Sequence, residues 1–284
     1  MKKNVHETGE LSGKIQQFVQ ELRKEERSDG TIEKYVRDVE QFAEWVDERP
    51  MTKELILLWK EELKSRYCPV TVNGKLASIN RFLEISGMME WRVKALKIQR
   101  RIFRDQRKEL TKEEYERLVT EAREQGKERL ALLMETICAT GIRVSELSYV
   151  TMEAVRTGKA EISLKGKIRV ILLPGKLCRK LSKYGKKYGI NAGQLFVTRN
   201  GTPVSRKQIW AEMKRLCREA GIEASKVFPH NLRHLFARCF YKACRDVVRL
   251  ADILGHSSVD TTRVYLISSG LEHERTLEGL HLIL

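Results

Sequence analysis

Apolar residues recur every three or four positions through the first third of the chain, which is the period of an amphipathic α-helix. Turn or capping residues separate the stretches, and Thr31 and Thr52 stand where an N-cap is expected. The pattern predicts a small helical bundle that ends near Trp91 or Leu96. Its four expected helices cover residues 11–22, 32–46, 55–63 and 72–83.

The rest of the chain mixes helices with one pair of strands. Thr111 and Glu114 form a capping box before a helix over 112–122, and a buried helix over 130–138 ends at Gly141. Residues 161–172 alternate around a glycine, which predicts a β-hairpin, the one convincing strand pair in the sequence. The expected fold is therefore mainly α with a small β-sheet. Further helices are expected over 142–147, 176–187, 206–220 and 231–254, and from 258 past 265.

The chain of 284 residues carries a formal net charge of +16. Its length suits two domains, and its apolar content of 42% is enough for a packed core. Such a charge repels itself unless a polyanion is the partner, and nucleic acid is the leading candidate because Lys and Arg bind phosphates with release of counterions. A merely basic protein, or one that meets anionic lipid, is the alternative against which the site motifs must decide.

No segment of the sequence indicates a membrane span or export. The apolar stretches are far shorter than the roughly 18 residues that a span needs, and no hydrophobic stretch follows the N-terminal lysines. The six cysteines lack the spacing of a zinc site and are expected to be free thiols in a reducing cytosol. We therefore expect a cytoplasmic protein that binds no metal.

A basic run over residues 97–108 contains six Lys or Arg residues and one acidic residue. It includes Arg100, Arg101 and Arg104, and no apolar period supports its packing. A charge run is usually only a solvated surface, but its place between two folded units favours a linker that lies along the DNA backbone. The expected organisation is a helical DNA-binding domain, a linker and a C-terminal domain, over residues 8–96, 97–109 and 110–284.

The candidate chemistry suits a phosphodiester. Phosphoryl transfer without a metal needs positive charge against the non-bridging oxygens, and an arginine fork offers two donors to one phosphate. Arg143 lies two residues after Gly141, which ends one helix, and stands at the start of the next helix. Glu146, one turn later, can orient its guanidinium. An ordinary surface ion pair between the two residues is the alternative.

Further candidates lie in the last quarter of the chain. His230 and Arg233 share one face at the start of a helix, where cations are otherwise disfavoured. His256 follows the helix-ending Gly255, and Tyr265 is the candidate nucleophile, because nearby arginines can stabilise its anion. Taken singly, a turn histidine and a core tyrosine are the ordinary interpretations.

Two other places gather basic side chains. The hairpin tip carries Lys165, Lys167 and Arg169, and the helix over 206–220 carries a basic surface. Both are predicted to contact DNA. The helix residues concerned are Arg206, Lys207 and Lys214.

The order of these motifs carries a resemblance. Ala-Thr-Gly-Ile-Arg-Val-Ser-Glu-Leu (139–147), the basic hairpin, His-Asn-Leu-Arg-His (230–234), Leu-Gly-His-Ser-Ser (254–258) and Tyr265 follow one another over about half of the chain. In this order they resemble the tyrosine recombinases, the phage integrase family, and most closely its compact two-domain Xer-like or mobile-element members. The likeness covers residues 31–269 and is strongest from residue 139 onward.

The resemblance implies a role for each matching residue. Arg143 and Arg233 would clamp the scissile phosphate, and His230 would accept the tyrosine proton. His256 would hydrogen-bond the transition state. Tyr265 would form a 3′-phosphotyrosyl bond with the DNA, and because that bond stores the energy of the cut ester, no cofactor, metal or ATP is implied.

The hairpin departs from the family pattern. The family turn is commonly Gly-Lys-Gly-x-Lys-x-Arg, whereas Leu-Lys-Gly-Lys-Ile-Arg here is one residue shorter. Lys165 aligns best with the general acid that protonates the leaving 5′-oxygen, and Lys167 is the alternative.

The resemblance also implies architecture and partners. A SAM-like core-binding bundle and an α+β catalytic domain would hold a double-stranded recombination site between them. Family members act as tetramers that exchange strands through a Holliday junction, and the tail 277–284 would dock onto a neighbouring protomer or onto its own domain. An accessory or directionality protein is a further candidate partner. A type IB topoisomerase and a catalytically silent DNA-binding regulator of the same fold are the alternatives.

Overall fold

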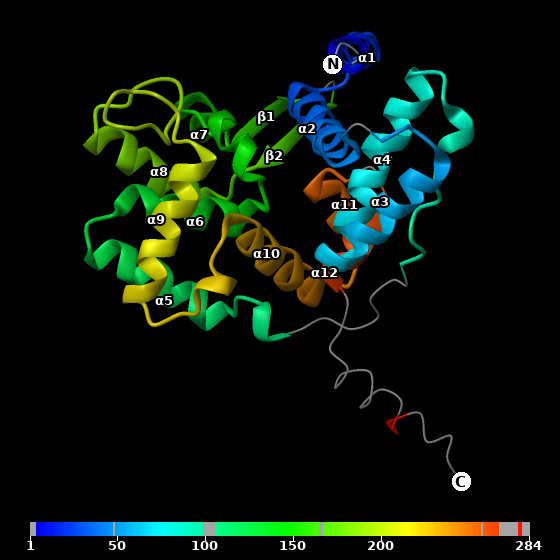
Figure 1. Cartoon of the computed structure of the whole chain (residues 1–284). Coiled ribbons are helices and arrows are strands. Elements are labelled where there is room, and N and C mark those ends of the chain that lie inside the picture. The colour runs from blue at the N-terminus through cyan, green and yellow to red at the C-terminus, as the bar shows by residue number, and fades with distance from the viewer. Residues whose placement is uncertain are drawn as a thin grey trace. The chain divides into compact units, whose positions relative to one another are not determined.

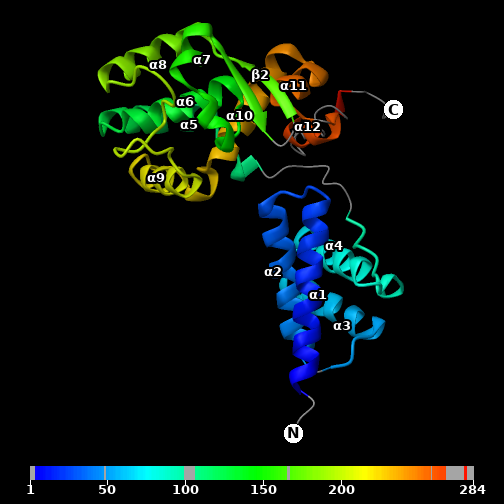
Figure 2. The same ribbon diagram turned by 90° about the horizontal axis from the view of Figure 1, so that it is seen from above.

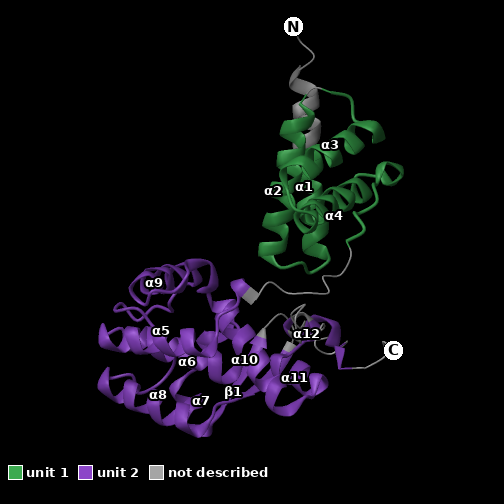
Figure 3. Cartoon of the chain, turned by 90° about the horizontal axis from the view of Figure 1, so that it is seen from below, with its two compact units in different colours: residues 1–100 green, residues 101–284 purple. Residues whose placement is uncertain are grey.

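A computed structural model describes residues 4–47, 49–98, 106–164, 167–256, 258–266 and 278–279. The chain divides into two compact units, Met1–Arg100 and Arg101–Leu284, which Figure 3 shows in different colours. Each unit has its own hydrophobic core, so each is described by itself.

Unit 1 is the expected helical bundle, followed by one 3-10 turn (Figure 2). Thr52 caps the third helix, because its hydroxyl accepts a hydrogen bond from the Leu55 amide at 3.2 Å. The second helix begins three residues earlier than expected: Ser28 takes the N-cap position in place of Thr31, and Asp29 adds an acidic side chain to the first turn. The elements are α1 (Asn4–Lys24), α2 (Asp29–Val46), α3 (Lys53–Arg66), α4 (Pro69–Ile85) and the turn Met89–Trp91.

A buried ion pair fastens α2 to α4. Asp38 of α2 is 4% exposed and accepts hydrogen bonds from Lys34 at 2.7 Å and from the Ser78 hydroxyl of α4 at 2.8 Å. Lys75 of α4 lies 3.4 Å from the second carboxylate oxygen. Burial raises the pKa of Asp38, but the hydrogen bonds and the charges of the two lysines outweigh it, so the pKa is lowered overall.

Unit 2 combines helices with a small sheet (Figure 1). The capping box is confirmed, because Thr111 and Glu114 each accept a hydrogen bond from the other's backbone amide. Residues 144–149 form a 3-10 turn instead of the expected α-helix, and the six-residue helix α7 was not predicted because it is too short to show a period. The helices are α5 (Lys112–Glu124), α6 (Glu128–Thr140), α7 (Met152–Thr157), α8 (Gly175–Lys187), α9 (Arg206–Glu219), α10 (Pro229–Cys244), α11 (Val247–Leu254) and α12 (Val259–Leu266), with 3-10 turns at Gln106–Lys108, Val144–Tyr149 and Ala224–Lys226.

The predicted hairpin is confirmed. Strands β1 (Lys159–Leu164) and β2 (Lys167–Leu172) pair antiparallel, with Lys159 opposite Leu172 and Leu164 opposite Lys167. Ala160, Ile162 and Ile171 are buried in the core of unit 2, whereas Ile168 and Val170 are exposed. The alternation therefore gives the hairpin one face toward the core and one toward solvent.

Helix α6 is the centre of unit 2. It contacts α5, α8, α9 and α10, and Figure 2 shows α5, α6 and α10 in a layer between α9 on one side and α7 and α8 on the other. Helix α10 also packs against α11 and α12. Between these three helices a separate buried cluster is formed by Ala237, Leu250, Leu254 and Tyr265. This arrangement brings the end of α6, the start of α10 and the α11–α12 turn together. No helix in the described ranges is both long and apolar enough to cross a membrane.

Candidate active site

Arg143 lies directly after the end of α6. Gly141 ends that helix with a φ of +65°, the left-handed conformation that glycine adopts without strain. The carboxylate of Glu146 accepts hydrogen bonds from the Arg143 backbone amide at 2.8 Å and from its Nη1 at 3.0 Å. Nη2 lies 3.4 Å from the Gly255 carbonyl oxygen, and 40% of the side chain is exposed. Glu146 thus contacts the guanidinium as expected, while part of the fork remains at the surface.

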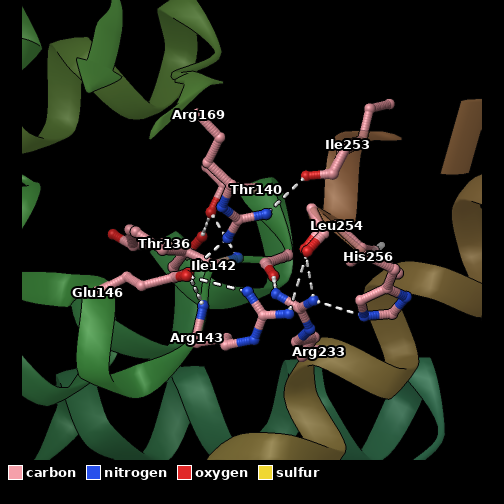
Figure 4. Close-up of polar contacts among 12 residues, drawn as sticks. Thr136, Thr140, Ile142, Arg143, Glu146, Arg169, Arg233, Ile253, Leu254 and His256 are labelled. Carbon is pink, nitrogen blue, oxygen red and sulfur yellow. Dashed lines mark hydrogen bonds and ion pairs between the residues drawn. The ribbon is translucent and has the colours of Figure 1, made fainter. Parts of the chain in front are cut away.

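Arg233 is the fifth residue of α10 and is only 1% exposed. Its Nη1 donates to the Gly141 carbonyl at 2.5 Å, and its Nη2 donates to the Leu254 carbonyl at 2.7 Å (Figure 4). Burial, together with the charges of Arg143 and another arginine, lowers the pKa of Arg233 to about 10. The guanidinium is therefore still charged at neutral pH.

His256 follows the left-handed Gly255 that ends α11. Its Nε2 lies 2.9 Å from Nη2 of Arg233, and its Nδ1 lies 2.8 Å from the hydroxyl of Thr262. An arginine only donates, so Nε2 accepts, and the proton of the neutral ring belongs on Nδ1, which donates to Thr262. Burial, followed by the charges of Arg233, Arg143 and two other basic residues, lowers the pKa of His256 to about 4. The imidazole is therefore neutral at pH 7.

Tyr265 of α12 is surrounded by imidazole rings. Its ring stacks on His256 with centroids 5.6 Å apart and an interplanar angle of 13°. The ring of His234 meets it edge-on at 4.5 Å, and that of His230 lies at 6.1 Å. Tyr265 is 5% exposed, whereas His230 lies at the surface. The structure thus brings the other three candidates of the last quarter, His230, His256 and Tyr265, close to Arg233.

Two residues of this site were not singled out in the sequence. His234 lies one helical turn after His230, and its ring is 4.5 Å from that of His230. Thr262 is fully buried and lies one turn before Tyr265. The spacing of three or four residues from a candidate side chain was the available signal, because such positions share a helix face.

Arg169 is one of the residues predicted to contact DNA, and in the structure its donors point to protein groups. Its side chain is 15% exposed; Nη2 donates to Glu146 at 2.5 Å, and Nη1 donates to the Ile253 carbonyl at 3.1 Å. Burial raises the pKa of Glu146, but the Arg143 amide and the charges of Arg169 and Arg143 outweigh it and lower that pKa overall. Burial also lowers the pKa of Arg169, against the opposing charge of Glu146. Both terminal nitrogens of Arg169 face the protein because alternation along β2 turns this side chain inward.

The basic helix α9 lies beside the cluster. An open pocket of about 410 Å³ is lined by Arg143, His230 and Arg233 together with Arg206 and the aromatic rings of Trp210 and Phe228. Arg206 is exposed at its rim. The pocket therefore joins the cluster to the surface of α9.

The other predicted DNA contacts differ in what the structure describes. Lys207 is exposed on α9, whereas Lys214 is half-buried, with Nζ bonded to the Ala224 carbonyl and 5.2 Å from the centroid of the Trp210 ring. Lys167 is the first residue of β2, but its side chain is outside the described part of the structure. The residues that lie wholly outside the described ranges are Arg100, Arg101, Arg104 and Lys165.

Comparison with known proteins decides the family. Residues 108–270 match the phage integrase family, and residues 15–85 match the N-terminal SAM-like domain of phage integrases. The chain belongs to the phage integrase family. The first match spans more than half of this integrase-family chain and includes every residue of the cluster between Arg143 and Tyr265.

Relatives match this phage integrase family member along nearly its whole length. Tyrosine recombinase XerA of Pyrococcus furiosus is 27% identical over 281 residues, which cover 94% of this chain and 95% of the relative. Tyrosine recombinase XerD of Xanthomonas campestris pv. campestris is 31% identical over 300 residues, which cover 94% and 91%. The resemblance predicted from the motifs is thereby confirmed.

Solved structures share the fold. A lambda integrase tetramer bound to a Holliday junction superposes with a TM-score of 0.72 at 18% identity, covering 90% of this chain and 76% of that chain. XerH recombinase in a post-cleavage complex with difH superposes with a TM-score of 0.69 at 19% identity, covering 88% and 79%. The predicted fold class, a helical N-terminal domain before an α+β integrase domain, is confirmed.

Proposed function

We propose that this phage integrase family member cleaves and rejoins DNA through Tyr265, with Arg143 and Arg233 binding the scissile phosphate. The observation that supports these roles most directly is the one cluster formed by Arg143, Arg233, His256 and Tyr265, which come from separate segments of unit 2. Family membership, with tyrosine recombinases as relatives over nearly the whole chain, makes site-specific DNA recombination the activity of this enzyme.

The charge of the cluster suits a phosphodiester. Arg143, Arg169 and Arg233 contribute three positive charges and Glu146 one negative charge, and three minus one leaves a net +2 while His256 is neutral. Negative charge grows on the phosphate oxygens as the tyrosine attacks, so fixed guanidinium groups favour the transition state over the ground state. Arg143 keeps part of its fork at the surface and is the arginine that a phosphate meets first.

In the proposed reaction the Tyr265 oxygen attacks the scissile phosphorus, and the bond from phosphorus to the 5′-oxygen breaks. His230 takes the phenol proton, and Lys165, or alternatively Lys167, protonates the leaving 5′-oxygen. The products are a 3′-phosphotyrosyl bond and a free 5′-hydroxyl group. Attack by the 5′-hydroxyl of another strand reverses the step, so resealing consumes no nucleotide.

Access to the nucleophile requires movement. Tyr265 and Arg233 are 5% and 1% exposed, so a phosphodiester reaches them only if the segment that carries Tyr265 shifts relative to α10. That segment, α12, has eight residues and is held by a small apolar cluster and by the bond between His256 and Thr262. DNA binding would have to displace these contacts and the ring contacts of Tyr265.

The proposed partners are double-stranded DNA and further copies of the chain. Relatives of the same fold have been solved as a dimer on a core site and as a tetramer on a Holliday junction. By extension, four copies of this chain would exchange strands between two DNA sites, with residues 277–284 docked on a neighbouring copy and an accessory protein as a further partner. Relaxation of the topoisomerase type is not favoured, because the relatives that match the whole chain are recombinases.

Covalent trapping tests the proposal. A nicked suicide duplex that carries the crossover site is incubated with the wild-type protein, Tyr265→Phe or Tyr241→Phe, and the products are separated on a denaturing gel. Tyr241 is a matched control because its ring packs against the same apolar cluster. We expect an adduct for the wild type and Tyr241→Phe and none for Tyr265→Phe. DNA binding without an adduct in any of the three proteins would instead support a silent DNA-binding regulator.

A further inference from the structure

We propose that Arg169 is a positioning residue, which fixes the orientation of Arg143 through Glu146 and anchors the end of α11 that leads into His256. The inference rests on the proposed roles of Arg143 and His256. It concerns a residue of the hairpin strand β2 whose guanidinium bonds to Glu146 and Ile253, and it assigns that residue to the arrangement of the site.

Among the described residues, the Arg169 guanidinium bonds to other groups of unit 2. Its guanidinium bridges Glu146, at 2.5 Å, and the Ile253 carbonyl, at 3.1 Å (Figure 4). The side chain is 15% exposed, and its Nε is buried without a hydrogen-bond partner among the described residues. An arginine that binds the DNA backbone would keep its donors at the surface, so these contacts favour an internal role.

Glu146 connects Arg169 to Arg143. Its side chain is 4% exposed; Oε1 accepts from Nη1 of Arg143, and Oε2 accepts from both the Arg143 amide and Nη2 of Arg169. A carboxylate held at both oxygens has one orientation, and the Arg143 fork bonded to it inherits that orientation. Without Arg169, Oε2 keeps only the Arg143 amide as a partner, so the carboxylate and the Arg143 fork bonded to it are held less firmly.

The C-terminal end of α11 is bonded to three arginines in succession. The carbonyl of Ile253 accepts from Arg169, that of Leu254 from Arg233, and that of Gly255 lies 3.4 Å from Nη2 of Arg143. Cations stabilise a helix C-terminus, where the last carbonyls lack partners of their own. The turn that holds His256 is therefore bonded to both proposed phosphate-binding arginines, and Arg169 bonds it to the hairpin.

The space beside Gly255 is occupied by the Arg169 side chain. A Cβ built on Gly255 would lie 2.5 Å from Cδ and 2.5 Å from Nη1 of Arg169, closer than real atoms approach. Its φ of +63° already favours glycine. The guanidinium therefore fills the space that a side chain on Gly255 would need.

The first test measures chemistry and binding separately. Arg169→Ala, Arg169→Lys and the control Arg156→Ala are compared in single-turnover adduct formation at saturating protein and in DNA affinity at several salt concentrations. Arg156 is a matched control because it also donates to a backbone carbonyl, that of Asn191 at 2.7 Å, but at the surface. A small misplacement of a catalytic group costs about tenfold to a hundredfold in rate. We therefore expect Arg169→Ala, which loosens Arg143, to slow adduct formation by that factor with unchanged DNA affinity, and Arg169→Lys to recover part of the rate.

Coupling to Glu146 separates positioning from mere folding. If Arg169 acts through the carboxylate, Arg169→Ala and Glu146→Gln together slow cleavage no more than the slower single variant does. Independent multiplication of the two effects would overturn the inference. A normal cleavage rate in Arg169→Ala would also overturn it. The same holds if Arg169→Ala binds DNA more weakly and the slope of log affinity against log salt becomes shallower by about one, because that is the behaviour of an arginine that contacts DNA.

The second test needs no DNA and therefore does not depend on the proposed function. Amide hydrogen exchange is measured over residues 250–256 in the wild type, Arg169→Ala and Gly255→Ala, with Gly158→Ala as a control that has the same left-handed backbone but no contact closer than 3.9 Å. We expect at least about tenfold faster exchange in that segment for Arg169→Ala and Gly255→Ala, but not for Gly158→Ala. Unchanged exchange in Arg169→Ala would refute the anchoring role even if the wild type cleaves DNA. Faster exchange in a protein that forms no adduct would leave the anchor supported and the proposed function rejected.

Discussion

The free energy of unfolding should depend on pH through His256. The pKa of this imidazole falls from an ordinary 6.5 to about 4 in the folded chain, because burial and the neighbouring arginines disfavour its charged form. Between these two values the unfolded chain binds a proton that the folded chain does not. Stability is therefore highest above pH 6.5, declines as the pH falls toward 4, and gains no further dependence on His256 below that.

The size of this effect follows from the shift. Each pH unit within the window removes up to about 1.36 kcal/mol, so acidification from pH 6.5 to 4.5 should cost about 2 kcal/mol, an upper limit because His256 is only half-buried. His256→Gln is the matched variant, since its amide oxygen can accept from Arg233 but does not titrate. Carboxylates such as Glu146 titrate in both proteins and cancel in the difference.

The assay is urea unfolding at half-unit steps from pH 4.5 to 7.5, with an NMR titration of the His256 ring as a direct check. The difference between the wild type and His256→Gln should shrink by about 2 kcal/mol as the pH falls through the window. Parallel stability curves for the two proteins, or a ring that titrates near its ordinary pKa, would refute the argument that the arginine cluster keeps His256 neutral.

Three other predictions concern packing, a buried charge and DNA binding. Gly141→Ala should cost about 2–4 kcal/mol of unfolding free energy, because a Cβ would lie 2.5 Å from the Phe236 ring at a φ of +65°, whereas Gly158→Ala, with a φ of +72° and its nearest neighbour at 3.9 Å, should cost about 1 kcal/mol in the same urea assay. Asp38→Asn should destabilise unit 1 by about 3 kcal/mol, because it removes the charge that neutralises buried lysine, and a cost below about 1 kcal/mol would show that the pair is replaceable. Arg206→Ala should leave the thermal midpoint unchanged and lower the slope of log K against log salt by about one in a DNA-binding titration; an unchanged slope would remove Arg206 from the interface.

Local features of the site were predictable because they depend on neighbouring residues. A glycine after an apolar helix predicts that the helix ends there in a left-handed conformation. This conformation is observed at Gly141 and at Gly255. The contact between Arg143 and Glu146 follows from a spacing of three residues. The hairpin was predictable from its period, although its start was placed two residues late because Lys159 and Ala160 add little to the alternation.

The direction of Arg169 was not predictable from its neighbours. The hairpin tip looked uniformly basic, and only the packing of β2 against unit 2 turns this side chain toward Glu146 and Ile253. Likewise, the rings of His230 and His234 lie beside Tyr265 only because α12 packs on α10. The residue types were evident in the sequence, but their partners were more than 20 positions away.

The sequence alone determined the class of the protein and the residue types of its chemistry, because helix period, capping, charge and motifs can each be recognised within a short stretch of sequence. The tertiary structure decided which of those groups are buried, charged and aligned. Arg233 and Tyr265 are almost entirely buried, His256 is neutral, and three arginines converge on consecutive carbonyls at the end of α11. Burial and pKa depend on the sum of contacts from α6, β2, α10, α11 and α12, and that sum exists only once these elements have packed together.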